Sequence, residues 1–379
     1  MSISDSSGAL LFYVTDVGIY TALGKELVGA PFTSSNWDDL IVVTERPRHE
    51  GQYYVFTTKP CFFPGAQQGH DCLNSVVIDV QDTGRVIKPY SLEDSIYAPG
   101  RWQPYFASPN GSVQHANGED WWLIIPLNHS DSIFTYKVTS QGIEGPIINE
   151  TNHFVNENRG NVLFKKDGSG FFLSSMFGRF GQTNVTSAVS EYLLDRCTGK
   201  VSFRKDWATP ANKSGALLSY SLALSSDESK LYSCNGKTDD RFQTGISKLI
   251  QFDLVQKTFF EVWENTDDRE HSLMNAKLGP DGKIYVALGH DYLTPQLRHP
   301  YNEYLSVIHQ PDSAGIACDF RLDDLSLAPG FTHIHLPNIP NFDLGPLELP
   351  TAQAGPDIAF GPCESDMVSL GTEAQANLV

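Results

Sequence analysis

The sequence predicts an all-β protein, folded as a β-propeller of four-stranded blades. Two observations support this prediction. A turn rich in Asp, Gly and Asn, followed by an aromatic strand, recurs along the chain, and no segment keeps the 3.6-residue apolar period of a helix. Four-stranded units repeated at intervals of about 40 to 70 residues are typical of propellers, in which each blade packs on the next and radial closure protects the strand edges.

The pattern of a turn followed by an aromatic strand has six copies. They read DSSGALLFY (5–13), HEGQYYVF (49–56), NGEDWWLI (117–124), KDGSGFFL (166–173), SDESKLYS (226–233) and PDGKIYVA (280–287). The aromatic anchors, spaced by 42, 68, 50, 60 and 53 residues, are Phe12, Tyr54, Trp122, Phe172, Tyr232 and Tyr285. We expect these anchors, and Trp121 beside them, to pack within and between blades instead of forming platforms for sugars.

Most anchors are followed by a second apolar or alternating run, such as SIFTYKV (132–138) or KLIQFDL (248–254), and then by a further turn. Each unit therefore offers about four short strands of β-branched and aromatic residues. Six blades are visible. A seventh could be assembled from residues outside these units together with FTHIHLPNIPNF (331–342).

Composition narrows the class of partner. The 379 residues include 27 basic and 45 acidic side chains, a formal net charge of −18. Nucleic acid and anionic membrane surfaces need a basic footprint, so neither is expected as a partner. The longest apolar stretch, near WWLIIPL (121–127), is far shorter than the ~20 residues of a membrane helix. The N-terminus shows no signal peptide, so the protein is either cytoplasmic or begins after its export signal.

Six cysteines are present, with no C-x-x-C pair and no spacing typical of zinc sites: Cys61, Cys72, Cys197, Cys234, Cys318 and Cys363. An even count is compatible with disulfides, and a bond from Cys61 to Cys72 would close a short loop. Six independent buried thiols are the alternative, because free cysteine is a common core residue.

Several segments, taken in order, resemble the propeller region of large secreted surface proteins of Bacteroidota. They include LFYVTDVGIYTALGKEL, GQYYVFTT, SIFTYKVTSQGI, LLDRCTGKV, LGPDGKIYVA, YLSVIHQPDSAGIACDF and HLPNIPNF, between about residues 5 and 345. The resemblance implies export to the cell surface. It also implies a longer chain with PKD-like or immunoglobulin-like modules and a gliding-motility or type IX sorting domain, and it implies no catalytic residues.

The resemblance also suggests the domain organisation. Residues 1–350 are expected to form the propeller, and residues 351–379 a linker and the truncated first strands of an immunoglobulin-like or PKD-like module. Related proteins usually have an extra β segment before the position where this chain begins, which leaves open how the ring closes.

Propeller geometry predicts where a site would lie. Turns between first and second strands share one face, whereas second-to-third and blade-to-blade loops share the other. Here the loops 59–73, 175–188, 234–247 and 288–302 are long, and variable loops on a rigid scaffold often carry binding residues. The candidate binding residues on these loops are His70, Asp71, Arg179, Asp240, Arg241, His290 and Asp291. Trp102, in GRWQPYF, is a candidate for contact with a carbohydrate. The alternative is that these polar side chains only solvate their loops.

Other polar residues point less clearly to a site. Asp167 and Asp281 are expected to cap tight turns. His333 and His335 alternate on one strand and are only half of a metal site. No G-x-S-x-G, H-E-x-x-H or Walker motif is present, and no G-x-G-x-x-G follows a strand. The sequence therefore predicts no catalytic residue, no metal and no cofactor.

Three functions remain in view. The first is a non-catalytic interaction, adhesion or display module that binds a protein or glycan at the cell surface. The second is a propeller enzyme of the lactonase, cyclase or glycan lyase type, with its site on the face of the long loops. The third is a carbohydrate-binding domain. Fold alone does not decide between them, because propellers host unrelated functions.

Overall fold

The computed structural model of the chain is a ring of six antiparallel sheets. It describes residues 2–5, 7–15, 18–29, 41–61, 70–81, 84–89, 96–97, 111–127, 130–155, 161–177, 186–208, 217–237, 247–265, 272–289, 303–332, 336 and 344. At the ends of several strands only the backbone is described.

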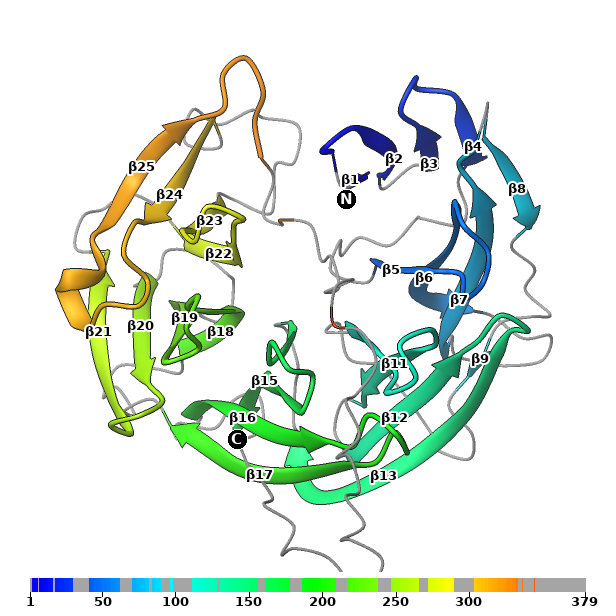
Figure 1. The fold of residues 1–379 in the computed structure, drawn as a ribbon. Helices are drawn as coiled ribbons and strands as arrows, with labels where there is room; N and C mark the ends of the chain where they lie inside the picture. The colour runs from blue at the N-terminus through cyan, green and yellow to red at the C-terminus, as the bar shows by residue number, and fades with distance from the viewer. Residues whose placement is uncertain are drawn as a thin grey trace, which may run out of the picture.

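Each sheet is a blade whose four strands follow one another in the chain (Figure 1). Blade 1 contains β1 (Ser2–Ser4), β2 (Leu10–Val14), β3 (Gly18–Thr21) and β4 (Glu26–Gly29). Blade 2 contains β5 (Ile41–Glu45), β6 (Gln52–Cys61), β7 (His70–Asp79) and β8 (Arg85–Lys88), and β9 (Ile96–Tyr97) also pairs with β7. Blade 3 contains β10 (Gly111–Gln114), β11 (Trp121–Pro126), β12 (Ser130–Val138) and β13 (Ile143–Val155).

The second half of the ring has the same order. Blade 4 contains β14 (Val162–Phe164), β15 (Gly170–Phe177), β16 (Thr186–Leu194) and β17 (Val201–Ala208). Blade 5 contains β18 (Leu217–Leu224), β19 (Lys230–Lys237), β20 (Ser247–Asp253) and β21 (Thr258–Glu264). Blade 6 contains β22 (Ser272–Leu278), β23 (Ile284–Gly289), β24 (Tyr304–Ile308) and β25 (Phe320–Ser326), with the short 3-10 helix η4 (Gly315–Cys318) before β25. The last strands, such as β13, β17, β21 and β25, lie on the outside of the ring (Figure 1).

The predicted propeller and its six visible blades are confirmed. Every anchor aromatic lies in the second strand of its blade: Phe12 in β2, Tyr54 in β6, Trp122 in β11, Phe172 in β15, Tyr232 in β19 and Tyr285 in β23. Five of the six are buried, and Tyr285 is half-buried. The predicted immunoglobulin-like continuation, residues 351–379, lies outside the described residues.

The described core consists of five apolar clusters, and each one lies between two blades that are consecutive in the chain. Blade 3 shows how one strand serves two clusters. Trp121 belongs to the cluster shared with blade 2, and Trp122 belongs to the cluster shared with blade 4. Successive strand residues point to opposite faces of a sheet, so an uninterrupted apolar strand buries both faces. The prediction that these tryptophans pack between blades is confirmed.

Side chains from the preceding blade bond the backbone of the innermost strands in blades 5 and 6. Asn161 accepts a hydrogen bond from the Leu222 N–H at 2.8 Å and donates one to the Leu222 carbonyl at 3.2 Å. The Ser221 hydroxyl accepts from the Ala276 N–H at 3.0 Å. An unpaired strand edge invites association with another strand. These side-chain contacts satisfy main-chain groups of β18 and β22 without a further strand.

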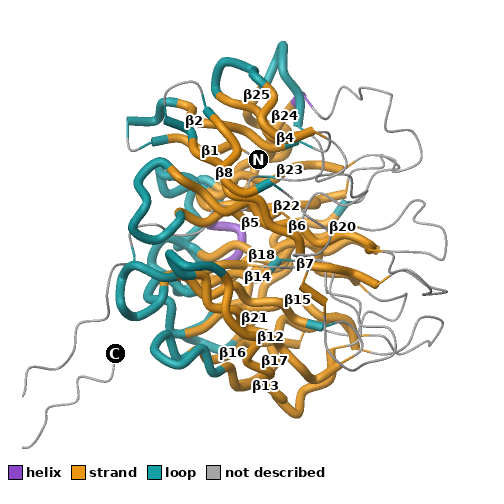
Figure 2. The backbone as a smooth tube through the Cα atoms, turned by 90° about the vertical axis from the view of Figure 1, so that its right-hand side faces the viewer, coloured by secondary structure: helices purple, strands orange, loops and turns teal. Residues whose placement is uncertain are grey.

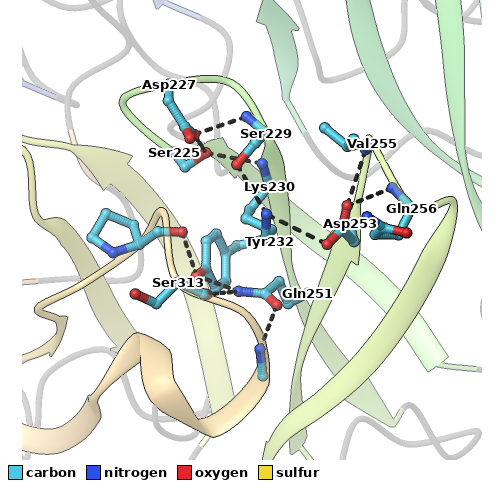
Figure 3. A network of polar contacts seen from close by, with 12 residues as sticks. Ser225, Asp227, Ser229, Lys230, Tyr232, Gln251, Asp253, Val255, Gln256 and Ser313 are labelled. Carbon is cyan, nitrogen blue, oxygen red and sulfur yellow. Dashed lines mark hydrogen bonds and ion pairs between the residues drawn. The ribbon is translucent and has the colours of Figure 1, made fainter.

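A buried polar network holds the segment before β25 against blade 5 (Figure 3). The Tyr232 hydroxyl donates to the Pro311 carbonyl at 2.7 Å and accepts from Gln251 Nε2 at 2.6 Å. Gln251 also donates to the Ser313 carbonyl at 2.7 Å and accepts from the Gly315 N–H at 2.8 Å. Both side chains are fully buried and fully bonded, which fixes the position of blade 6 on blade 5.

Candidate functional site

The described turns gather on one face of the ring, where Figure 2 draws them in teal. They join the first strand to the second and the third to the fourth, and we call this side the short-turn face. Because neighbouring strands are antiparallel, β6, β15, β19 and β23 end on the opposite side, at Cys61, Phe177, Lys237 and Gly289. We call that side the long-loop face. The ring thus separates the two kinds of connection as predicted.

One predicted loop is shorter than expected. β6 continues to Cys61 and β7 begins at His70, with Pro60 opposite Asp71 and Cys61 opposite His70. The placement of His70 and Asp71 in a loop was therefore wrong, because they are the first two residues of a paired strand. Pro and Gly residues indicated a loop but did not show where pairing stops. The side chains of both residues lie outside the description.

The remaining candidate binding residues lie outside the described residues and stay predictions: Trp102, Arg179, Asp240, Arg241, His290 and Asp291. His333 and His335 also lie outside them. The predicted disulfide likewise stays a prediction, because the backbone register pairs Cys61 with His70 and Cys72 with Lys59, and neither cysteine side chain is described. Three described cysteines are free, with Cys197 exposed and Cys234 and Cys318 buried.

Polar side chains of the short-turn face bond the turns that carry them. The carboxylates of Asp167, Asp227 and Asp281 each accept from the N–H two residues further on, at 2.9, 2.9 and 3.3 Å. Asp5 accepts from two backbone N–H groups and from the Ser7 hydroxyl. Burial opposes ionisation of Asp227, but hydrogen bonds from Ser229 and Ser225 hold its pKa well below the usual range. The prediction that Asp167 and Asp281 serve turn chemistry is confirmed.

A neutral polar layer lies near the long-loop ends of three strands of blade 5. The hydroxyls of Ser219 and Ser233 are 2.8 Å apart, and Ser233 donates to Asn235 Oδ1 at 3.1 Å. The Ser247 hydroxyl donates to the Asn235 carbonyl at 3.2 Å. All four residues are buried, and Asn235 Nδ2 has no hydrogen-bond partner within the described part of the chain.

This layer was not predicted from the sequence. Its signal is the serine and asparagine residues inside otherwise apolar strands, in LLSYSLAL (217–224) and KLYSCNGK (230–237). Hydroxyls and an amide can hydrogen-bond a neutral polar group, and they hold no charge near pH 7. The layer therefore suits the positioning of neutral groups and contains no general base.

Ser190, His153 and Asp206 meet between blades 3 and 4. His153 Nε2 lies 3.1 Å from the Ser190 hydroxyl and 3.3 Å from Asp206 Oδ1, and Ser190 donates to that same Oδ1 at 2.8 Å. A catalytic triad needs the acid on one imidazole nitrogen and the serine on the other. Here both contact the same nitrogen, and Ser190 is fully buried.

The surroundings of His153 explain its state. Its ring stacks on Phe203 with centroids 4.0 Å apart, and burial lowers the pKa of His153 against the opposing effect of Asp206. The three residues therefore join β13 to blade 4 and do not form a hydrolase site.

Within the described ranges, no three His, Cys, Asp or Glu side chains gather in a way that could hold a metal ion. A helix long and apolar enough to cross a membrane is also absent from the described part of the chain.

Comparison with known proteins gives neighbours of similar fold. No family model and no curated protein matches the sequence. Among solved structures, the periplasmic gluconolactonase PpgL of Pseudomonas aeruginosa is 16% identical with a TM-score of 0.41, over 68% of this chain and 63% of that one. A glucose dehydrogenase is 13% identical with a TM-score of 0.45, over 76% and 91%. A β-propeller domain from Vanderwaltozyma polyspora is 8% identical with a TM-score of 0.36, over 71% and 85%.

The match thus spans less than two thirds of the gluconolactonase. At these identities and TM-scores, the likeness concerns the β-propeller fold and gives no argument about activity.

Proposed function

We propose that the protein is a non-catalytic binding module that holds its partner on the long-loop face of the propeller. The difference between the two faces is the observation that supports this most. On the short-turn face, the turn aspartates are engaged by their own backbone. Binding residues are carried preferentially on loops held by a rigid scaffold, and the chain places its long connections on the other side.

The packing of the ring supports the scaffold role. Each pair of blades that follow one another in the chain shares a buried apolar cluster, and the network around Tyr232 and Gln251 adds fixed polar contacts. A rigid ring holds the strand ends in constant positions, so ordering them on binding costs little entropy. The neutral polar layer lies near the long-loop ends of β18 and β19, on the same side as this face.

The resemblance to secreted surface proteins of Bacteroidota supports a place at the cell surface, within a longer multi-domain chain. The partner would then be a protein or a glycan, presented in an interaction, adhesion or display role. The net charge of −18 supports a partner other than nucleic acid or an anionic membrane.

An enzyme with its site on the same face is the second candidate, of the lactonase, cyclase or glycan lyase type. Of these types a lactonase is the simplest to test, because opening a sugar lactone releases a proton that can be followed directly. A carbohydrate-binding domain is the third candidate, and Trp102 is the residue proposed for its contact.

Two assays on the same preparation separate these candidates. The chain is applied to arrayed glycans and surface proteins, and hydrolysis of δ-gluconolactone is followed by proton release. Saturable binding without hydrolysis above the buffer rate is the expected result. Hydrolysis that scales with protein concentration, and that is lost in His70→Ala or His290→Ala, would replace the binding module with the enzyme.

A further inference from the structure

Three basic side chains of blade 4 gather around one carboxylate near the junction with blade 5. Lys165 Nζ and Arg204 Nη1 lie 2.8 and 2.7 Å from Glu191 Oε1, and Lys205 Nζ lies 4.0 Å from Glu191 Oε2. Lys257, in the turn between β20 and β21, is close enough to act on the charge of Lys205. We call Lys165, Arg204, Lys205 and Lys257 the basic cluster.

A β-bulge in blade 4 creates the arrangement. Lys205 pairs with Glu191 and Phe203 pairs with Tyr192, which leaves Arg204 as the extra residue of β17. A bulge redirects side chains, and here it brings two successive basic residues to the same carboxylate. Bulges are frequent next to binding sites, where they aim a side chain that regular pairing would turn away.

Glu191 is an internal partner and leaves the cluster with excess positive charge. Its side chain is 4% exposed, whereas those of Lys205 and Arg204 are 36% and 50% exposed. Trp207 Nε1 donates to Glu191 Oε2 at 3.1 Å, and Lys205 Nζ lies 3.4 Å from the centre of the Trp207 ring. The neighbouring carboxylate of Asp206 is engaged with His153 and Ser190 instead.

The excess is unusual in a chain with a net charge of −18. Burial lowers the pKa of Lys205, and Arg204, Lys257 and Lys165 lower it further, against the opposing effect of Glu191. Like charges held together repel, so an anion between the exposed guanidinium and ammonium groups would relieve the repulsion. Arg and Lys donors directed at one point are the groups that bind oxyanions through charge-assisted hydrogen bonds.

We propose that the basic cluster is a binding site for an oxyanion, namely a phosphate, sulfate or carboxylate group of a ligand. Arg204 and Lys205 supply the exposed donors, Lys165 is paired with the buried Glu191, and Lys257 adds positive charge from the turn between β20 and β21. The site lies between two blades at the turn between β20 and β21, away from the long-loop face, and does not depend on the function proposed above.

Titration of inorganic phosphate, sulfate and glucuronate at constant ionic strength tests the proposal. Binding is followed by calorimetry and by the unfolding temperature. The natural chain is compared with Arg204→Gln/Lys205→Gln and with the control Lys200→Gln/Lys283→Gln, which removes the same charge from two lysines outside the cluster. The natural chain and the control should bind at least one of the anions saturably, with a dissociation constant on the order of 1 mM. The double variant at the cluster should bind about tenfold more weakly or worse.

The relative strength of the three anions identifies the class of ligand, since glucuronate offers a planar carboxylate and the other two are tetrahedral. Circular dichroism checks that both variants keep the native fold. If all three proteins show the same shift in unfolding temperature, the effect is a general salt effect and the proposal is wrong. Absence of saturable binding to any of the three anions would also overturn it.

Discussion

Replacing Gly199 with alanine should destabilise the ring far more than the same change at Gly8. Both glycines have a left-handed φ, +70° at Gly199 and +83° at Gly8, so both variants carry the backbone cost of about 1 kcal/mol. Their surroundings differ. A Cβ at Gly8 would meet nothing within 4 Å, whereas a Cβ at Gly199 would lie 2.6 Å from Cη2 and 2.7 Å from Cζ3 of Trp122.

The Trp122 ring cannot yield without cost. It is 3% exposed in the cluster between blades 3 and 4, and its Nε1 donates to the Arg196 carbonyl at 2.8 Å. Overpacking a core costs about 1–3 kcal/mol, and loss of a buried hydrogen bond adds about 1 kcal/mol. With the backbone term, Gly199→Ala should cost about 3–5 kcal/mol and Gly8→Ala about 1 kcal/mol.

Urea unfolding followed by tryptophan fluorescence and by far-UV circular dichroism measures both variants. Agreement between the two signals justifies the comparison of free energies. Equal losses at the two positions, or a loss below about 1 kcal/mol at Gly199, would refute the packing of this turn against Trp122.

Three further predictions follow from the described contacts. Tyr232→Phe removes a hydroxyl that bonds Pro311 and Gln251, so it should lower the free energy of unfolding by about 1–2 kcal/mol and speed proteolysis within residues 309–319. The control Tyr13→Phe should do neither. An unchanged cleavage pattern in Tyr232→Phe would contradict the prediction. Burial opposes ionisation of Glu191, but the bonds from Lys165, Trp207 and Arg204 lower its pKa. Ionised Glu191 therefore stabilises the fold at pH values above its unfolded pKa of about 4.3. This stabilisation is lost as the pH falls through the lower pKa of the folded state. Glu191→Gln should therefore cost about 1–3 kcal/mol at pH 7 and much less near pH 3, and a difference that stays constant with pH would refute the sign. Iodoacetamide at pH 8 should modify exposed Cys197 in the native chain but reach Cys234, whose pKa burial raises to about 12, only after unfolding; native labelling of Cys234, read by peptide mass spectrometry, would contradict its burial.

The architecture was predictable because its signals are local. A turn aspartate or asparagine bonds the backbone two residues on, and a strand that packs on two neighbouring blades needs apolar residues on both faces. Asp167 with Phe172, and Asp281 with Tyr285, are therefore readable within short windows of sequence. Six such windows predicted the six blades that the described ring contains, although the sequence left a seventh blade open.

The ends of the strands were not predictable in the same way. Pairing of β6 with β7 reaches Cys61 and His70 because each strand supports the other, which sequence composition around Pro60 does not reveal. The bulge at Arg204 depends on register against β16, and the isolated sequence of β17 carries no mark of it.

Contacts between residues far apart in the sequence could not be predicted from the local sequence pattern either. Arg196 bonds the carbonyls of Gln114 and His115, and Asn161 bonds Leu222 in the next blade. Each of these partners becomes a neighbour only when the blades stack. The neutral polar layer around Asn235 was missed for a related reason, since serine in a strand indicates a site only when its burial is known.

The position of the binding face is the central claim, and a paired set of variants tests it most directly. Binding of the purified chain to an array of dextran, xylan and peptidoglycan fragments is measured for the natural protein, for Asp71→Ala, Arg241→Ala and His290→Ala, which are predicted for the long-loop side, and for Glu50→Ala, Lys200→Ala and Lys283→Ala on the short-turn face. We expect binding to be lost or reduced only in the first group. Loss confined to the second group would place the binding surface on the short-turn face and contradict the proposed position of the site.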